Sequence, residues 1–184
     1  MKIIFNLIFF TLYFFSVPCF ASEESARAYT AIWIEENITK VNKKDIETIV
    51  KHAFYNSSKH MIDPFLILAV IKHESRFNKK ALNKSAKGLM QIIPYWHKDK
   101  IANRNVLNIA TNIEVGSQIL KDCSEKTNGN ITKTLNCYRG LTDRKYVAKI
   151  LKTRKELRQW VVENQFQLQL PIYHASISEN KVLQ

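Results

Sequence analysis

A run of seven consecutive apolar residues, Phe65 to Ile71, limits the folds open to this chain more than any other segment does. Asp63 can cap a helix that begins here, and Pro64 suits its first turn. A helix that is apolar on all sides has no face to offer to water, so it must be buried. We therefore expect this segment to be the core helix of the domain.

Apolar residues recur at helical spacing along most of the remaining sequence. This spacing predicts further helices over residues 25–37, 45–59, 112–123, 131–138 and 145–160. Segments 78–87 and 98–108 lack the spacing and read as loops, and no run alternates like a β-strand for long. The predicted fold is mainly α, with a single globular domain over residues 22–160. The tail, residues 161–184, shows no convincing period.

The first twenty-one residues have the features of a secretory signal peptide. Lys2 is their only charge, an apolar stretch follows, and small residues stand at positions 19 and 21. Cleavage after Ala21 is expected, which would send the protein to the periplasm or cell envelope. The alternative is an uncleaved membrane anchor, because the apolar stretch is about long enough to span a bilayer.

Charge and cysteine content restrict the function classes. The net charge of +12 suits an acidic surface, which could be a cell wall, an anionic lipid face or nucleic acid. Export places Cys123 and Cys137 where disulfides persist, so a bridge between them is expected, with two buried free thiols as the alternative. The cysteine and histidine spacing matches no zinc site, so we expect no metal.

Glu74 is the residue best placed for chemistry. It lies one turn beyond the apolar run, and Ile67, Val70 and Ile71 precede it by seven, four and three positions, so it extends an inward-facing stripe. Burial and a helix C-terminus both disfavour a carboxylate, and both would raise its pKa toward the range of a general acid. The alternative is a surface glutamate at a fraying helix end.

Four segments in order, LILAVIKHESRFN, GLMQIIP, NIEVG and CYRG, resemble the motifs of soluble-type lytic transglycosylases, which are relatives of goose-type lysozyme. The resemblance covers roughly residues 46–151 and implies a lysozyme-like fold. It makes Glu74 the catalytic acid and base. It implies that Ser75 helps to orient this acid or its loop. It places Met90 and Gln91 along the glycan cleft and the Tyr138 hydroxyl close to the acid. Asn112 and Gly116 match a structural part of the family pattern.

The sequence departs from the family pattern at four places, one of which is the segment from Tyr138 to Gly140, which is a residue short. The loop after Phe77 is one residue shorter than is common, and Ser85 stands where glycine is frequent. Arg139 follows Tyr138 where the family usually has asparagine, and arginine cannot accept a hydrogen bond as an amide can. None of these departures removes the catalytic acid. They concern the residues that would place the substrate near the bond that is cut.

The resemblance implies cleavage of peptidoglycan glycan strands between N-acetylmuramic acid and N-acetylglucosamine, with a 1,6-anhydro product and no cofactor. Two alternatives are a lysozyme-type hydrolase of the same bond and a catalytically decayed wall-binding assembly factor. An exported nucleic-acid binder rests on charge alone and lacks interleaved aromatics, so we expect no nucleic-acid partner. The small single domain is similar to transglycosylases that accompany secretion or conjugation machines, and a monomer is expected.

Overall fold

The computed structural model describes residues 22–182, with side-chain surroundings over residues 22–165. The predicted signal peptide, residues 1–21, lies outside the described residues. Across the described part the chain is mainly helical, which confirms the predicted fold class. The helices are α1 (Glu23–Asn37), α2 (Lys43–His60), α3 (Pro64–Ser75), α4 (Lys98–Ile101), α5 (Ile109–Lys126), α6 (Ile131–Arg139) and α7 (Arg144–Val182).

Helix α3 is the centre of the core, as its sequence predicts. Every residue from Leu66 to Ile71 is buried, and α3 packs against both α2 and α7. Asp63 caps its first turn by accepting a hydrogen bond from the Phe65 amide at 2.8 Å. The second carboxylate oxygen of Asp63 accepts from Arg154 of α7, at 2.6 Å, which ties the start of the core helix to α7.

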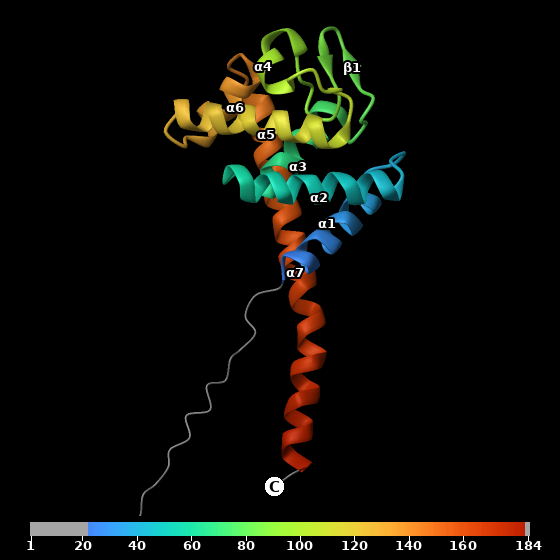
Figure 1. Cartoon of the computed structure of the whole chain (residues 1–184). Helices are drawn as coiled ribbons and strands as arrows, with labels where there is room; N and C mark the ends of the chain where they lie inside the picture. The colour runs from blue at the N-terminus through green and yellow to red at the C-terminus, as the bar shows by residue number, and fades with distance from the viewer. Residues whose placement is uncertain (1–21, 183–184) are drawn as a thin grey trace, which may run out of the picture.

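The other helices surround α3 in two groups (Figure 1). Helices α5 and α6 pack on each other beside the short elements that follow α3, while α1 and α2 lie on the opposite side. Helix α7 runs past α3 and packs against α1 and α6, and α2 also packs directly against α5, so the two groups are in contact. The site described below is formed by α3, α5, α6, the start of α7 and the loop before α4.

Short elements occupy the segments that were predicted to be loops. A two-stranded antiparallel hairpin, β1 (Leu82–Asn83) and β2 (Ala86–Lys87), pairs Leu82 with Lys87, and a 3-10 turn, η1 (Pro94–Trp96), leads into α4. The prediction of loop over residues 98–108 was therefore wrong for α4. One helical turn is too short to create a periodic apolar pattern, so periodicity does not reveal α4.

Helix α7 also differs from expectation, because it continues to Val182 rather than ending near Trp160. A helix needs an apolar stripe only where it packs on a core. The loss of period after Glu163 therefore did not mark the end of the helix. Among the described residues, no helix is both long enough and apolar enough to cross a membrane.

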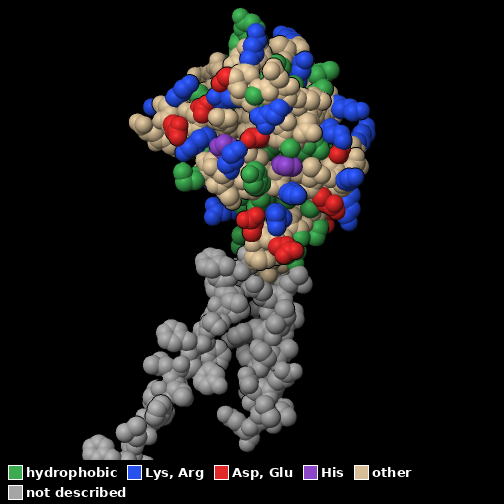
Figure 2. All heavy atoms as spheres, in the orientation of Figure 1, with side chains coloured by type: hydrophobic (Ala, Val, Ile, Leu, Met, Phe, Trp, Pro, Cys, Tyr) green, Lys and Arg blue, Asp and Glu red, His purple; other side chains and the backbone are tan. Residues whose placement is uncertain are grey.

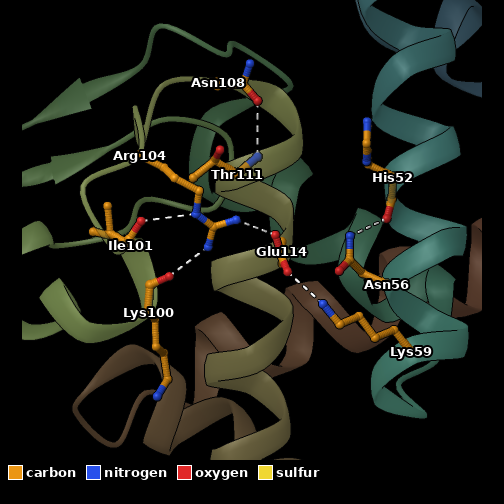
Figure 3. A network of polar contacts seen from close by, with 9 residues as sticks. All are labelled: His52, Asn56, Lys59, Lys100, Ile101, Arg104, Asn108, Thr111 and Glu114. Carbon is orange, nitrogen blue, oxygen red and sulfur yellow. Dashed lines mark hydrogen bonds and ion pairs between the residues drawn. The ribbon is translucent and has the colours of Figure 1, made fainter.

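Two covalent or charged links hold α5 in place. A disulfide joins Cys123 of α5 to Cys137 of α6, with the two Cα atoms 5.7 Å apart, so the predicted bridge is present. On the other side, Glu114 of α5 accepts from Lys59 of α2 at 2.7 Å and from Arg104 at 2.6 Å (Figure 3). Arg104 also donates to backbone carbonyls of α4, which fixes that short helix beside α5.

Candidate active site

Glu74 lies in the last turn of α3, where the core helix reaches the surface. The helix ends one residue later, at Ser75, because Arg76 adopts the left-handed conformation with φ of 52° and turns the chain away. The carboxyl group is half-buried, and the Tyr146 hydroxyl donates a 2.6 Å hydrogen bond to its Oε1 atom. Tyr146 belongs to the first turn of α7 and is itself 8% exposed.

The surroundings of Glu74 shift its pKa upward. Burial is the largest cause, because it disfavours the charged carboxylate, while the Tyr146 hydrogen bond and the positive charge of Arg139 act in the opposite direction. The Tyr146 hydroxyl stays neutral, since burial and the nearby Glu74 charge both raise its own pKa. Glu74 therefore has the property that a general acid at moderate pH requires.

Glu74 opens onto a cleft of about 480 Å³. Helices α3, α5 and α6 contribute to its walls, together with the hairpin and the segment from Gln91 to Lys100. Both polar and apolar side chains line it, including Gln91, Trp96, Tyr138 and Arg139. Such a mixture suits a ligand with hydroxyl and amide groups as well as apolar ring faces.

Two other carboxylates, Asp99 and Asp122, also line this cleft, but both are paired with a cation. Lys100 Nζ lies 2.9 Å from Asp122 and 3.5 Å from Asp99. The backbone and the Lys100 ammonium lower the pKa of Asp99. Burial thus favours the protonated form of Glu74, whereas the surroundings of Asp99 favour its ionised form.

The loop that carries Met90 and Gln91 is held by Asn112 of α5. Its Oδ1 atom accepts from the Met90 amide at 2.7 Å, and its Nδ2 atom donates to the carbonyls of Lys87 and Val106. Gly88 has φ of +78°, and a Cβ atom there would lie 2.2 Å from the Asn112 side chain. The Asn112 side chain therefore supplies hydrogen bonds that the backbone groups of this loop would otherwise make to another strand. Only glycine at position 88 allows the loop to approach Asn112 this closely.

Gly116 makes room for the Met90 side chain of the same loop. A Cβ atom at this position would lie 2.4 Å from the sulfur of Met90, whose side chain is fully buried against it. Asn112 and Gly116 stand four positions apart, so they lie on one face of α5. Their spacing in the sequence is thus explained by support of the loop.

The predicted site residues divide into two groups. Glu74, Gln91 and Tyr138 line one cleft. Ser75 and Met90 are not among its lining residues, because the Ser75 hydroxyl donates to the Ile71 carbonyl at 3.1 Å and the Met90 side chain lies in the core. Met90 takes part through its carbonyl, which accepts a 2.7 Å hydrogen bond from the Tyr138 hydroxyl.

Sequence reasoning did not identify Tyr146 or Trp96 as candidates. Tyr146 is followed by buried Val147 and Ile150, so an inward stripe at the start of α7 was the available signal. Trp96 is 66% exposed although it follows the GLMQIIP motif within a few residues, and it lines the cleft. The indole ring of Trp96 therefore offers an apolar face and one N–H group to a ligand in the cleft.

The described residues contain no group of three His, Cys, Asp or Glu side chains that could hold a metal ion. Lys and Arg side chains are spread over the visible face of the described domain rather than gathered in one patch (Figure 2). The polar and charged side chains that line the cleft are Glu74, Asn83, Gln91, His97, Asp99, Lys100, Asp122, Lys126, Tyr138 and Arg139.

Comparison with known families agrees with this arrangement. The family model of the transglycosylase SLT domain matches residues 51–160, which include Tyr146 and every residue that lines the cleft. No solved structure matches the chain. The family match confirms the resemblance and the lysozyme-like character of the mainly α domain. The chain belongs to the transglycosylase SLT domain family, whose general activity is lytic transglycosylation of peptidoglycan.

Proposed function

We propose that this chain is an exported lytic transglycosylase that cuts the β-1,4 bond between N-acetylmuramic acid and N-acetylglucosamine. In this proposal Glu74 serves as both acid and base. The observation that carries it is the contrast among the cleft carboxyls. The pKa of Glu74 is raised by burial, while Asp99 and Asp122 are paired with Lys100.

The proposed reaction needs only one such group. Protonated Glu74 donates its proton to the bridging oxygen, and the bond from this oxygen to the muramyl C1 breaks. The acetamido group of the same sugar stabilises the positive charge that develops at C1. The Glu74 carboxylate then removes the proton of the muramyl 6-hydroxyl, whose oxygen bonds to C1 and closes the 1,6-anhydro ring. Glu74 is protonated again at the end, so no cofactor is consumed.

The contacts of Glu74 support this double role. Tyr146 occupies Oε1, and no hydrogen bond to Oε2 is found within the described part of the chain, so this atom is available to the substrate. The Tyr138 hydroxyl and the Gln91 side chain hold the loop from Gly88 to Gln91 through hydrogen bonds to its backbone carbonyls. Gln91 Nε2 donates to the Gly88 carbonyl at 2.9 Å, which leaves its amide oxygen for a sugar hydroxyl or acetamido group.

The products decide between this proposal and a hydrolase. Purified peptidoglycan is incubated with the protein, and the released fragments are analysed by mass spectrometry. The proposal expects 1,6-anhydro-muramyl ends, which are lighter than reducing ends by one water. Reducing ends would identify a lysozyme-type hydrolase that uses the same acid.

Matched variants test the role of Glu74. Glu74→Gln keeps the shape but cannot transfer a proton, so release should fall by roughly 100- to 10,000-fold. Glu36→Gln changes an exposed glutamate of α1 in the same way and should leave release unchanged. Binding to the wall without cleavage by the unmutated protein would instead favour a catalytically decayed assembly factor.

We further propose that the protein acts in the periplasm or cell envelope and opens the wall for a secretion or conjugation machine. The signal-like sequence of residues 1–21 and the small domain support this. An N-terminus at Ser22 in protein from the envelope is expected, whereas Met1 in the membrane fraction would indicate an anchor. Loss of the gene should lower transfer by the machine, and Glu74→Gln protein should fail to restore it.

A further inference from the structure

Arg139 lies at the place where this chain departs most clearly from the family pattern. It is the last residue of α6, and Gly140, with φ of 76°, turns the chain away directly after it. Its guanidinium lies over the ring of Tyr146, 4.7 Å from the ring centroid, and it lines the same cleft as Glu74. The stacking contact holds the planar group in place and leaves its N–H edges free for other partners.

Within the described residues, the charge of Arg139 makes one long ion pair. Its nearest carboxylate oxygen, on Asp143, is 3.8 Å from Nε, and within the described part of the chain its guanidinium donates no hydrogen bond. The arginines that stabilise this fold are different. Arg154 contacts Asp63 through two nitrogen atoms at 2.6 Å, and Arg104 bonds Glu114 and two carbonyls. The side chain of Arg139 is also 40% exposed, so a ligand in the cleft can reach it.

We propose that Arg139 recognises a carboxylate carried by the muramyl side of the substrate, an inference that rests on the proposed function. A guanidinium with free N–H edges is the protein group best suited to bind a carboxylate through two parallel hydrogen bonds. N-acetylglucosamine carries no carboxylate, whereas a muramyl unit carries one on its lactyl group or on the peptide attached there. Arg139 would thus distinguish the two sugars of the strand at the site of cleavage.

The electrostatic effect of Arg139 on Glu74 fits this role. The positive charge of Arg139 lowers the pKa of Glu74, which works against an acid that must be protonated. A bound carboxylate would neutralise that charge, so the pKa of Glu74 would rise once the correct substrate is in place. Arg139 would then favour an anionic substrate in two ways. It would bind the carboxylate directly, and its neutralisation would favour the protonated form of Glu74.

Binding experiments test the proposal without cleavage when they are made in Glu74→Gln protein. Three ligands of equal length are compared, namely N-acetylglucosamine oligomers, peptide-free glycan strands and strands that carry their peptides. We expect at least one class of muramyl strand to bind tenfold or more tightly than the N-acetylglucosamine oligomers. Adding Arg139→Gln should remove this preference, while Arg144→Gln, an exposed arginine at the start of α7, should keep it.

The pattern of loss identifies the source of the carboxylate. If Arg139→Gln removes the preference for peptide-free strands, the carboxylate is that of the lactyl group. If it removes only the preference for peptide-bearing strands, the carboxylate belongs to the stem peptide. A preference that survives Arg139→Gln, in protein with unchanged circular dichroism, overturns the proposal and leaves the proposed function intact. Failure of the Glu74→Gln protein to bind any glycan would instead count against the proposed function itself.

Discussion

The Tyr146 hydroxyl donates a 2.6 Å hydrogen bond to Glu74 Oε1, across 72 positions of sequence. This bond joins the end of the core helix α3 to the start of α7. It fixes one carboxyl oxygen and thereby orients the other toward the cleft. It also stabilises the ionised carboxylate, so Tyr146 acts on the position of Glu74 and on its pKa at once.

Replacing Tyr146 with phenylalanine separates these effects from packing, because the ring still fills the buried site. The hydrogen bond lowers the Glu74 pKa, so its removal should move the alkaline limb of the pH profile of kcat to higher pH. The maximal rate should fall about tenfold, since a hydrogen bond to a charged group is worth about 1.5 kcal/mol or more. Turnover measured from pH 4 to 9 checks both; an unmoved alkaline limb would show that the bond does not tune the acid.

Tyr138→Phe provides the contrasting case. Its hydroxyl donates to the Met90 carbonyl and therefore supports the loop of Gln91 rather than the acid. We expect lower activity through a raised KM, with the alkaline limb shifted less than in Tyr146→Phe. The same kinetic series on purified peptidoglycan measures this. Unchanged turnover at every substrate concentration would reduce Tyr138 to a packing residue.

The comparison of these tyrosines shows what sequence could and could not predict. The core helix, its cap and the inward position of Glu74 follow from local rules, because periodicity and capping depend on neighbouring residues. The partner of Glu74 depends on how α7 crosses α3, and the inward stripe of α7 does not specify this tertiary relationship. The family pattern directed attention to Tyr138, whose ring does line the cleft, and gave no reason to select Tyr146.

The same limit applies to the loop residues. Met90 was expected along the cleft, yet its side chain packs on Gly116, since a motif position does not reveal which way a side chain points. Conversely, the short helix α4 and the exposed Trp96 produce no periodic signal. The sequence marks Arg139 only as a departure from the family pattern. Its position over the Tyr146 ring is seen in the structure alone, because the two residues lie on different helices.

Trp96 should act as a platform for a sugar ring. It is 66% exposed and lines the cleft, so the apolar face of a pyranose can cover its indole ring and remove both surfaces from water. Tyr95 is a matched control, because it is 75% exposed in the same turn but is not among the cleft-lining residues. Trp96→Ala should raise KM for glycan strands about tenfold with little change in kcat, and Tyr95→Ala should change neither. Equal effects of the two variants would contradict the platform.

The disulfide between Cys123 and Cys137 should contribute to stability and to the shape of the cleft, because both residues line it. A bridge that closes a loop of this length is worth about 3 kcal/mol on the chain-entropy model. The double variant Cys123→Ala, Cys137→Ala should therefore melt at a clearly lower temperature in thermal unfolding. Alkylation of exported protein without reductant, followed by intact-mass measurement, should show no added groups, and uptake of two would mean that the bridge is absent.

Glu74 should lower the stability of the fold at neutral pH. Burial raises its folded-state pKa above the usual value of 4.5. A group with a raised folded pKa contributes its stability fully below the unfolded pKa and loses it as pH rises through the folded pKa. Glutamine does not titrate and can still accept the Tyr146 hydrogen bond.

Glu74→Gln should consequently raise the melting temperature at pH 8, and this gain should shrink as the pH is lowered toward 4. The exposed control Glu36→Gln should show no such trend. Thermal unfolding of both variants and the unmutated protein between pH 4 and 8 measures the difference. A gain independent of pH would mean that Glu74 is not held in a site that disfavours its charge, and the case for it as the general acid would lose its electrostatic basis.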